Sequence, residues 1–356
     1  MSTYLTALAW HHLVWLGAAL LIVRRESDPQ RAHRWLCFGI LGSWISPALA
    51  LCVHALGGGL LPAPGIERLT DHESIGTRTW LLAAWGLLSS GAAAGFLRRL
   101  IRTRRLLRLT VPAVSPRLSS ALREAQRRTD AGPVITRLAE QLDTPAIWCW
   151  SRVPTILMPT RLVSTLDEEA LTALLCHELA HLRRRDHWAH LFLTVSAILL
   201  PWSPLVHRVR SRALALAESA CDQAVLSAGV SPPRYARTLL GLATRDSGAL
   251  TLAATGSSLT RRVESILAGP MSSPATRSGR VGVALGVALA ALLSLLQTRA
   301  GVEVVFRGTD GSVQRFVHRD VPLTWSADHA APRSLSEGSA PSGFHFVFEN
   351  GDEVIR

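Results

Sequence analysis

Long apolar stretches are concentrated in the first hundred residues of this chain and recur once after residue 280. Each holds about 16 to 22 mostly apolar residues, and the four stretches are 5–23, 35–56, 80–97 and 281–296. A helix of this length is close to what is needed to cross the hydrocarbon core of a bilayer, so we predict four transmembrane helices. The last stretch is the shortest and is rich in alanine and glycine, and a buried helix is the alternative there.

A fifth apolar stretch, residues 189–206, is interrupted by Pro201 and Pro204. The polar motifs described below flank it on both sides and must stay on one side of the membrane to act together. We therefore expect this stretch to dip into the membrane and return, or to pack on the membrane surface.

Shorter patterns between residues 98 and 279 predict a domain of helices around a small sheet. Residues 115–142 carry a mixed amphipathic pattern punctuated by prolines, and short strands are expected around 147–158. Apolar residues recur at helical spacing over 171–182 and again over 212–225. The segment is therefore predicted to form an α+β domain. It is bounded by three membrane helices in residues 1–97 and a fourth in 280–298.

The tail, residues 299–356, has the alternating pattern of short strands. Two β-hairpins are predicted, one over 302–317 and one over 344–355 with its turn at Asn350-Gly351. The tail is thus expected to be a small β-rich module.

The run His177-Glu178-Leu-Ala-His181 lies inside the helical pattern and carries the strongest chemical signal. Residues four apart share one face of a helix, so both imidazoles can reach one Zn²⁺ while Glu178 lies beside the water that the metal would bind. Thr165 and Glu168 have the spacing of a capping box at the start of this helix. A chance occurrence of the motif on a core helix is the alternative.

A hydrolytic zinc usually has three protein ligands, so a third must be found. His187 has the spacing of peptidases that bend sharply after the second histidine, but this chain lacks the glycine on which the bend relies. We expect the helix to run on through the three arginines that follow, which makes His187 the weaker choice. Glu218 is favoured, because Asp222 falls one turn later on the same face and can hold an imidazole from behind.

Arginine placement predicts the orientation of the membrane helices. Four arginines lie within 24–34 and six within 98–108, whereas residues 57–79 hold two arginines against three acids. Short cytoplasmic loops carry the positive excess, so the N-terminus is predicted to lie outside. The domain at 98–279 then faces the cytoplasm, and the tail lies outside. The first span is expected to be retained as a signal anchor.

Composition favours membrane lipids over nucleic acid as partners of the basic residues. The chain is 48% hydrophobic with a mean hydropathy of +0.23, and all 38 of its basic residues are arginine. These arginines cluster beside the apolar stretches, as expected for contacts with anionic headgroups, so direct nucleic-acid binding is not expected. The five cysteines show no C-x-x-C spacing, and Cys176 and Cys221 are expected to be buried thiols.

The combination H-E-L-A-H-L-R-R-R-D, an apolar helix and E-S-A-C-D-Q-A-V resembles the membrane zinc peptidases of the β-lactam-sensing antirepressors. The likeness covers roughly residues 153–226, with a weaker echo at T-R-R-V-E-S-I-L, residues 260–267. It implies a gluzincin-like fold in which His177, His181 and Glu218 hold zinc and Glu178 is the catalytic base. It also implies an active site that faces the cytoplasm.

In such families an edge strand near the active site can pair with an extended substrate. The resemblance places that strand at Thr155, Ile156, Leu157 and Met158. The alternative is an ordinary short buried strand bounded by Pro154 and Pro159.

The chain departs from the sensing antirepressors in its outer part. Their sensor is a large penicillin-binding domain acylated at the serine of S-x-x-K, but this sequence contains no lysine, and its tail is too short for such a domain. We therefore expect no β-lactam receptor of that kind.

These observations predict a mainly α integral membrane protein of the bacterial cytoplasmic membrane, which acts as a zinc-dependent endopeptidase. The expected substrate is a cytoplasmic protein, such as a DNA-binding transcriptional repressor, and the enzyme itself is a further candidate. One alternative is a housekeeping membrane metallopeptidase for quality control or lipoprotein processing. Another is a non-catalytic membrane receptor or scaffold. A donor to the carbonyl oxygen is also expected, with candidates His187, Arg208, Arg210 and Arg212.

Overall fold

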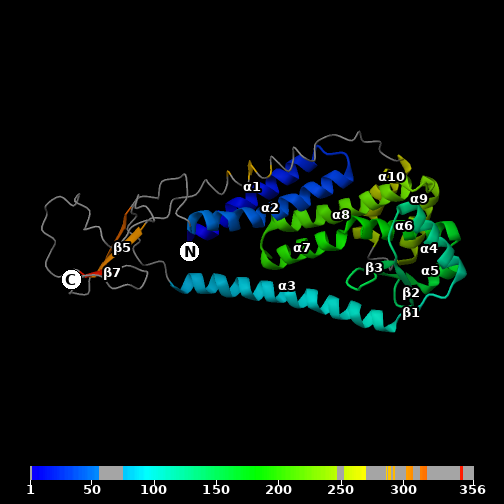
Figure 1. Ribbon diagram of the computed structural model, residues 1–356, viewed down its shortest axis with the longest axis horizontal. Coiled ribbons are helices and arrows are strands. Elements are labelled where there is room, and N and C mark those ends of the chain that lie inside the picture. The colour runs from blue at the N-terminus through cyan, green and yellow to red at the C-terminus, as the bar shows by residue number, and fades with distance from the viewer. Residues whose placement is uncertain are drawn as a thin grey trace. The chain divides into compact units, whose positions relative to one another are not determined.

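The computed structural model describes residues 2–55, 75–246 and 252–269, three strands of the tail at 302–307, 313–318 and 345–347, and four isolated positions between 286 and 292. The chain divides into two compact units. The smaller comprises Met1–Val14, Leu41–Thr77 and Thr276–Arg356, and the larger comprises Trp15–Ile40 and Arg78–Ala275. The described part is mostly helical (Figure 1).

Three long helices come first: α1 (Ser2–Val23), α2 (Pro29–Ala55) and α3 (Ile75–Leu109). They contain the first and third predicted spans and the second as far as Ala55. Among the described residues, Pro29–Val53 is long and apolar enough to cross a membrane, and Trp10–Val23 is apolar but shorter. Helix α3 continues past its apolar half into the arginine-rich segment. The fourth predicted span lies outside the described residues apart from isolated positions, so four transmembrane helices remain a prediction.

Helices α1 and α2 approach closely within the larger unit because one residue has no side chain. A Cβ placed on Gly39 would lie 2.5 Å from Cβ of Ala19, which no real pair of atoms tolerates. Trp15 and Phe38 pack edge to face beside it, with ring centroids 5.7 Å apart.

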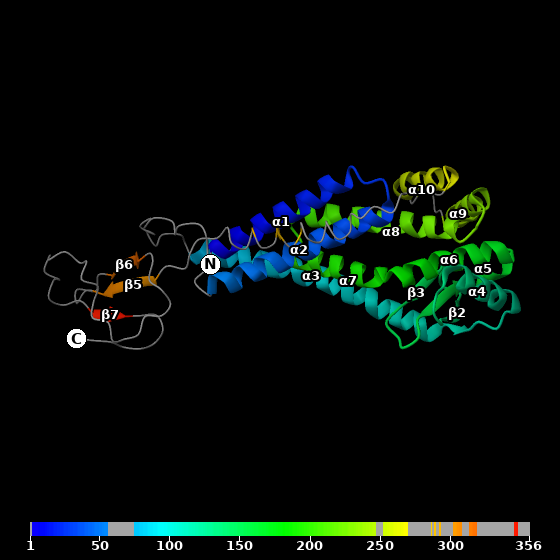
Figure 2. The same ribbon diagram turned by 45° about the horizontal axis from the view of Figure 1, so that its top comes forward.

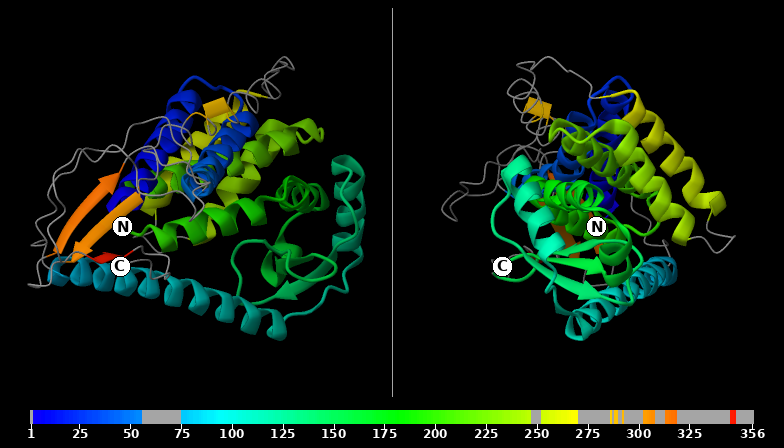
Figure 3. Two further views of the ribbon diagram at one scale, coloured as in Figure 1. Left: turned by 60° about the vertical axis from the view of Figure 1, so that its left-hand side comes forward. Right: turned by 90° about the vertical axis from the view of Figure 1, so that its right-hand side faces the viewer.

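A four-stranded sheet follows α3, with β1 (Val111–Pro112), β2 (Ile135–Ala139), β3 (Ala146–Trp148) and β4 (Thr155–Pro159). The spatial order is β1-β2-β4-β3; β4 is parallel to β2 and antiparallel to β3. Figure 3 shows these strands, in green, at the end of the long cyan helix α3. The sheet thus confirms the strands expected around residues 147–158.

The prediction that Thr155, Ile156, Leu157 and Met158 form an edge strand is wrong. All four residues are buried, and each pairs with a residue of β2, as in Ile156↔Thr136. On the other side Ile156 also pairs with Ile147 of β3. Both rows of backbone groups are therefore used inside the sheet, and this strand cannot receive a substrate. The outer strand on that side of β4 is β3.

Helix α6 (Glu168–Arg184) is the central helix of the larger unit, and most of its residues are buried. It packs on α4 (Pro116–Thr129) and contributes Leu171, Leu175 and Leu179 to the hydrophobic core. Met158 of β4 and Leu226 of α8 (Pro204–Ser227) belong to the same core. The core therefore fixes the buried side of α6 against the sheet and α8.

The start of α6 differs from the predicted capping box. Thr165 belongs to the short helix α5 (Thr160–Thr165), where its hydroxyl donates to the carbonyl of Arg161. Asp167 is the N-cap of α6, and its carboxylate accepts from the backbone N–H of Ala170 at 2.8 Å. Both Thr165 and Asp167 have side chains that can cap a helix N-terminus. Because Thr165 is part of α5, Asp167 is the residue that caps α6.

The prediction that α6 continues through all three arginines is also wrong. Arg185 adopts a left-handed conformation with φ of 59°, so α6 ends at Arg184 and α7 (Asp186–Leu199) starts at once in a new direction. No glycine is needed for this break, although the conformation is uncommon for a residue with a side chain. The break brings Asp186 back beside α6.

Helices α7 and α8 form a hairpin joined by residues 200–203 (Figure 2). Ser203 caps α8 with Pro204 in its first turn, so the expected reversal occurs at the two prolines. The predicted helix over 212–225 is only the second half of α8.

Two further helices, α9 (Pro232–Asp246) and α10 (Leu252–Leu267), complete the larger unit. Gly229, with φ of 82°, makes the turn between α8 and α9. Tyr235 of α9 and Ile266 of α10 are almost fully buried in the core with α6.

In the tail, β5 (Val302–Arg307) and β6 (Val313–His318) pair antiparallel, which confirms the first predicted hairpin. The third strand, β7 (His345–Val347), pairs with β5 and gives the order β6-β5-β7. The second half of the other predicted hairpin lies outside the described residues.

The observed cap makes a testable prediction. Replacing Asp167 by alanine should destabilise the protein by about 1 kcal/mol, because the N–H of Ala170 loses its acceptor and Arg234 loses an exposed ion-pair partner that contributes little. Thr165→Ala is the matched control and should have a much smaller effect. Unfolding in detergent measures both, and equal losses would restore Thr165 as the cap.

Candidate metal centre

Helix α6 presents His177 and His181 on one face, one turn apart, with Glu178 between them. The two rings stand nearly perpendicular, at 82°, with centroids 4.9 Å apart. His177 is 8% exposed and His181 is half-buried, so both imidazoles are largely removed from solvent.

Glu218 of α8 faces both histidines. One carboxylate oxygen lies 3.5 Å from Nε2 of His177, and the other lies 3.4 Å from Nε2 of His181. A potential ligand atom from each of the three residues lies within 4.8 Å of the other two. The structure therefore brings together the three residues that the sequence selected, although 37 positions separate Glu218 from His181.

These separations fit a single small metal ion. Tetrahedral zinc with bonds of about 2.0–2.1 Å places neighbouring ligand atoms roughly 3.3 Å apart. The two histidine–glutamate distances of 3.4 and 3.5 Å, each to a different carboxylate oxygen, are close to that value. Two imidazole nitrogens and a carboxylate are also the ligand types of a catalytic zinc site that leaves one position open.

The opposite nitrogen of each imidazole is held by buried polar groups. Nδ1 of His177 lies 2.9 Å from the hydroxyl of Tyr235, which donates to Asp222 at 2.7 Å, and 3.2 Å from Asp222 itself. Nδ1 of His181 lies 2.9 Å from Asp186. With a proton on each Nδ1, both Nε2 atoms present a lone pair toward Glu218.

One arginine ties the acidic side of the site together. Arg262 of α10 donates to both carboxylate oxygens of Asp222 at 2.8 Å, and its Nη1 lies 3.1 Å from Glu218. Because Arg262 is partly buried, this bidentate pair fixes Asp222 more firmly than an exposed ion pair would. Helix α10 is thereby part of the site.

The chain matches the model of the family described as BlaR1 peptidase M56 over residues 70–266, which is more than half of its length. The chain belongs to this family. Membership identifies it as a membrane metallopeptidase, a hydrolase that depends on a metal ion. The matched region contains the whole cluster, from the α6 histidines to Arg262. A search of curated proteins found no match.

Electrostatics at this peptidase site oppose the cost of burial. Burial alone would lower the pKa of His177, but Asp222 and Glu218 outweigh it and raise that pKa. Burial likewise would raise the pKa of Asp222, but His177 and Arg262 lower it to about 2. The pKa of Glu218 is lowered against burial by His177, His181 and Arg262. Both carboxylates are therefore ionised at neutral pH.

Glu178 differs from these acids. Burial raises its pKa, and no hydrogen bond holds its carboxylate within the part of the chain that the structure describes. An unanchored carboxylate with a raised pKa, beside two imidazoles, has the properties of a general base.

Three residues of the cluster were missed by the sequence reasoning: Asp186, Tyr235 and Arg262. Asp186 stands at the end of the R-R-R-D run, and Arg262 lies in the weak echo at 260–267, so both signals were present. No sequence pattern indicated Tyr235, because its contact with His177 arises only from the turn after α8, which packs α9 against α6.

The residues predicted as hydrogen-bond donors to the carbonyl oxygen of the substrate are not part of the metal cluster. His187 packs edge to face on Trp150, with centroids 5.5 Å apart. Arg208 and Arg212 line a separate cavity that contains none of the cluster residues. Nε of Arg210 is buried and has no hydrogen-bond partner among the residues that the structure describes.

A second group of possible ligands, His181, Asp186 and Cys221, shares a histidine with the first. Burial raises the pKa of the Cys221 thiol, which disfavours the thiolate that a metal requires. Nδ1 of His181 is also bonded to Asp186. The first group is therefore the better metal site.

The contact behind His181 can be tested by replacing Asp186 with asparagine. Zinc affinity should fall by about 10–100-fold, because a neutral amide orients and polarises the imidazole less well. Asp143→Asn, at an exposed carboxylate, is the matched control and should not change affinity. Competition with a fluorescent zinc chelator measures both variants, and equal affinities would exclude this role for Asp186.

Proposed function

We propose that this chain is a zinc-dependent endopeptidase of the membrane, with His177, His181 and Glu218 as the metal ligands. The observation that carries the proposal is the convergence of two Nε2 atoms and one carboxylate at separations suited to one zinc ion. Asp222, Tyr235 and Asp186 orient the imidazoles from behind.

Bound zinc would supply a Lewis acid that activates a water and polarises the carbonyl of the scissile peptide bond. Glu178 would take the proton of the attacking water and then deliver it to the leaving amine. Its freedom from other hydrogen bonds among the described residues suits a group that must both accept and release a proton. Arg262 would keep Glu218 and Asp222 ionised and in place.

We further propose that the substrate is a cytoplasmic protein, with a transcriptional repressor as the first candidate and the enzyme itself as another. Arginines after α1 and along α3 support a cytoplasmic peptidase domain. The outer side of β3 pairs with no other strand among the described residues, so it offers an extended peptide an edge for pairing, in place of the interior strand β4.

The catalytic assignment predicts different results for two substitutions. Glu178→Gln should keep zinc and lower the cleavage rate on the order of 10²–10⁴-fold, because only the base is lost. His181→Ala should lose both the metal and the activity. Glu168→Gln, at an exposed position of α6, is the control and should behave as wild type.

Metal analysis of the purified protein and a proteome-wide comparison of cleavage products in cells provide the measurements. Active Glu178→Gln enzyme would refute the assignment. A repressor cut only by the wild type would support the regulatory substrate, whereas cleavage confined to damaged membrane proteins would indicate a housekeeping peptidase instead.

The proposed topology can be tested with reporter fusions. A fluorescent protein that matures only in the cytoplasm should fluoresce when inserted after Ser273 and stay dark after Arg356. A phosphatase that is active only outside the cytoplasm should show the reverse pattern. Fluorescence at both positions would contradict the fourth span.

A further inference from the structure

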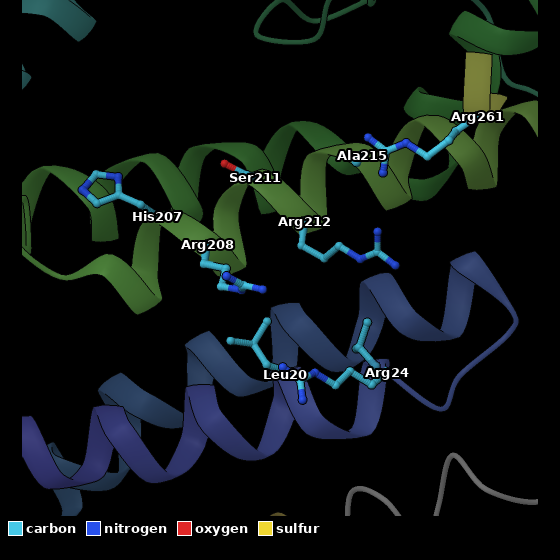
Figure 4. A pocket seen from close by; sticks show the side chains of 9 residues that line it. Leu20, Arg24, His207, Arg208, Ser211, Arg212, Ala215 and Arg261 are labelled. Carbon is cyan, nitrogen blue, oxygen red and sulfur yellow. The ribbon is translucent and has the colours of Figure 1, made fainter. Parts of the chain in front are cut away.

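A cavity of about 650 Å³ lies between the end of α1, the first half of α8 and α10, all within the larger unit. Figure 4 shows Arg208 and Arg212 extending from α8 toward α1, with Arg24 opposite them and Arg261 entering from α10. We call this space the arginine cavity. None of its lining residues belongs to the metal cluster.

The charges around the arginine cavity are of one sign. Four guanidinium groups border it, and no carboxylate is among the lining residues that the structure describes. Arg24, Arg208 and Arg212 also form no ion pair with any described residue. Like charges around a partly apolar space repel one another, so an anion between them would be stabilised. The planar fork of arginine suits phosphate oxygens in particular.

The remaining wall of the arginine cavity combines an apolar part with two polar side chains of α8, His207 and Ser211. Leu20 and Val23, from the last turn of α1, and Ala215 of α8 form the apolar part of the lining, and Figure 4 shows Leu20 on the side of the cavity opposite Arg208 and Arg212. The volume is much larger than an inorganic phosphate requires, since liquid water occupies only about 30 Å³ per molecule. Its volume and lining therefore fit a phosphate that is attached to an apolar group.

The position along the chain points to a lipid as the source of that phosphate. The apolar part of α1 ends at Val23, and Arg24 follows directly. A helix that leaves the hydrocarbon core at this point would place Arg24 at the level of the headgroups. Basic pockets between helices on the cytoplasmic side of a membrane are known lipid sites.

We propose that the arginine cavity binds the phosphate-bearing headgroup of an anionic phospholipid, with the apolar part of the lipid against Leu20 and Val23. This proposal rests on the membrane location proposed above but not on proteolysis. Lipid binding can therefore be measured in the Glu178→Gln protein, and a failure of the catalytic assignment would leave the result intact.

The test uses full-length Glu178→Gln protein in mixed micelles of phosphatidylglycerol and phosphatidylcholine, with retained lipids counted by native mass spectrometry. We expect phosphatidylglycerol to be retained at least about tenfold better than phosphatidylcholine. Adding Arg208→Gln and Arg212→Gln together should abolish that preference. The matched control, Arg104→Gln with Arg108→Gln, removes the same charge at the same spacing from exposed positions of α3 and should keep it.

The proposal would be overturned if the parent protein, the cavity variant and the α3 control all retained phosphatidylglycerol equally well. It would also be overturned if the α3 control lost the preference to the same extent as the cavity variant, which would indicate a diffuse attraction of anionic lipid to basic residues. Inorganic phosphate provides a separate arm. If it raises the melting temperature through Arg208 and Arg212 while phosphatidylglycerol is not retained, the ligand is a soluble phosphate and the lipid assignment is wrong. Zinc content serves as the control for folding of each variant. If the double variant loses zinc, the single variant Arg212→Lys replaces it: this variant keeps the positive charge but loses the planar guanidinium, and it should still weaken retention of phosphatidylglycerol severalfold.

Discussion

The geometry of the metal centre depends on the contacts that hold Nδ1 of His177 and Nδ1 of His181, on the side of each ring that faces away from Glu218. His177 rests on Tyr235 and Asp222, and His181 rests on Asp186, so both rings are fixed before any metal binds. Each partner comes from a different element: α8 and α9 for His177, and the start of α7 for His181. A ligand set with two histidines on one helix is thus oriented by three other helices, and the packing of those helices sets the geometry of the site.

Much of this arrangement could be predicted from local sequence patterns. The three apolar stretches near the N-terminus and the helical spacing around His177 each have a signal within a few residues. Glu218 was also found, because Asp222 stands one turn beyond it on the same face. Such features depend on periodicity and turn chemistry, which short segments of sequence carry.

The errors share a different cause. The residues Thr155 to Met158 have the sequence of a short apolar strand whether that strand lies at the edge or in the interior of the sheet. Only the parallel pairing with β2 makes it an interior strand. Asp167 and Thr165 can both cap a helix, and the choice depends on whether α5 forms. Arg185 has no local feature that predicts a left-handed conformation. In each case the deciding contact comes from outside the segment, so its own residues could not reveal it.

The break at Arg185 also explains the charge balance of the site. It returns Asp186 to α6, where that carboxylate joins Glu178, Glu218 and Asp222 around the two imidazoles. Arg184 contacts Asp186, and Arg262 contacts Glu218 and Asp222. With neutral imidazoles and an ionised Glu178, these two guanidinium groups leave the group two negative charges in excess. Buried charge of one sign is costly unless it is compensated. A divalent cation between the Nε2 atoms and Glu218 would cancel that excess, so the same contacts that orient the ligands also favour the metal.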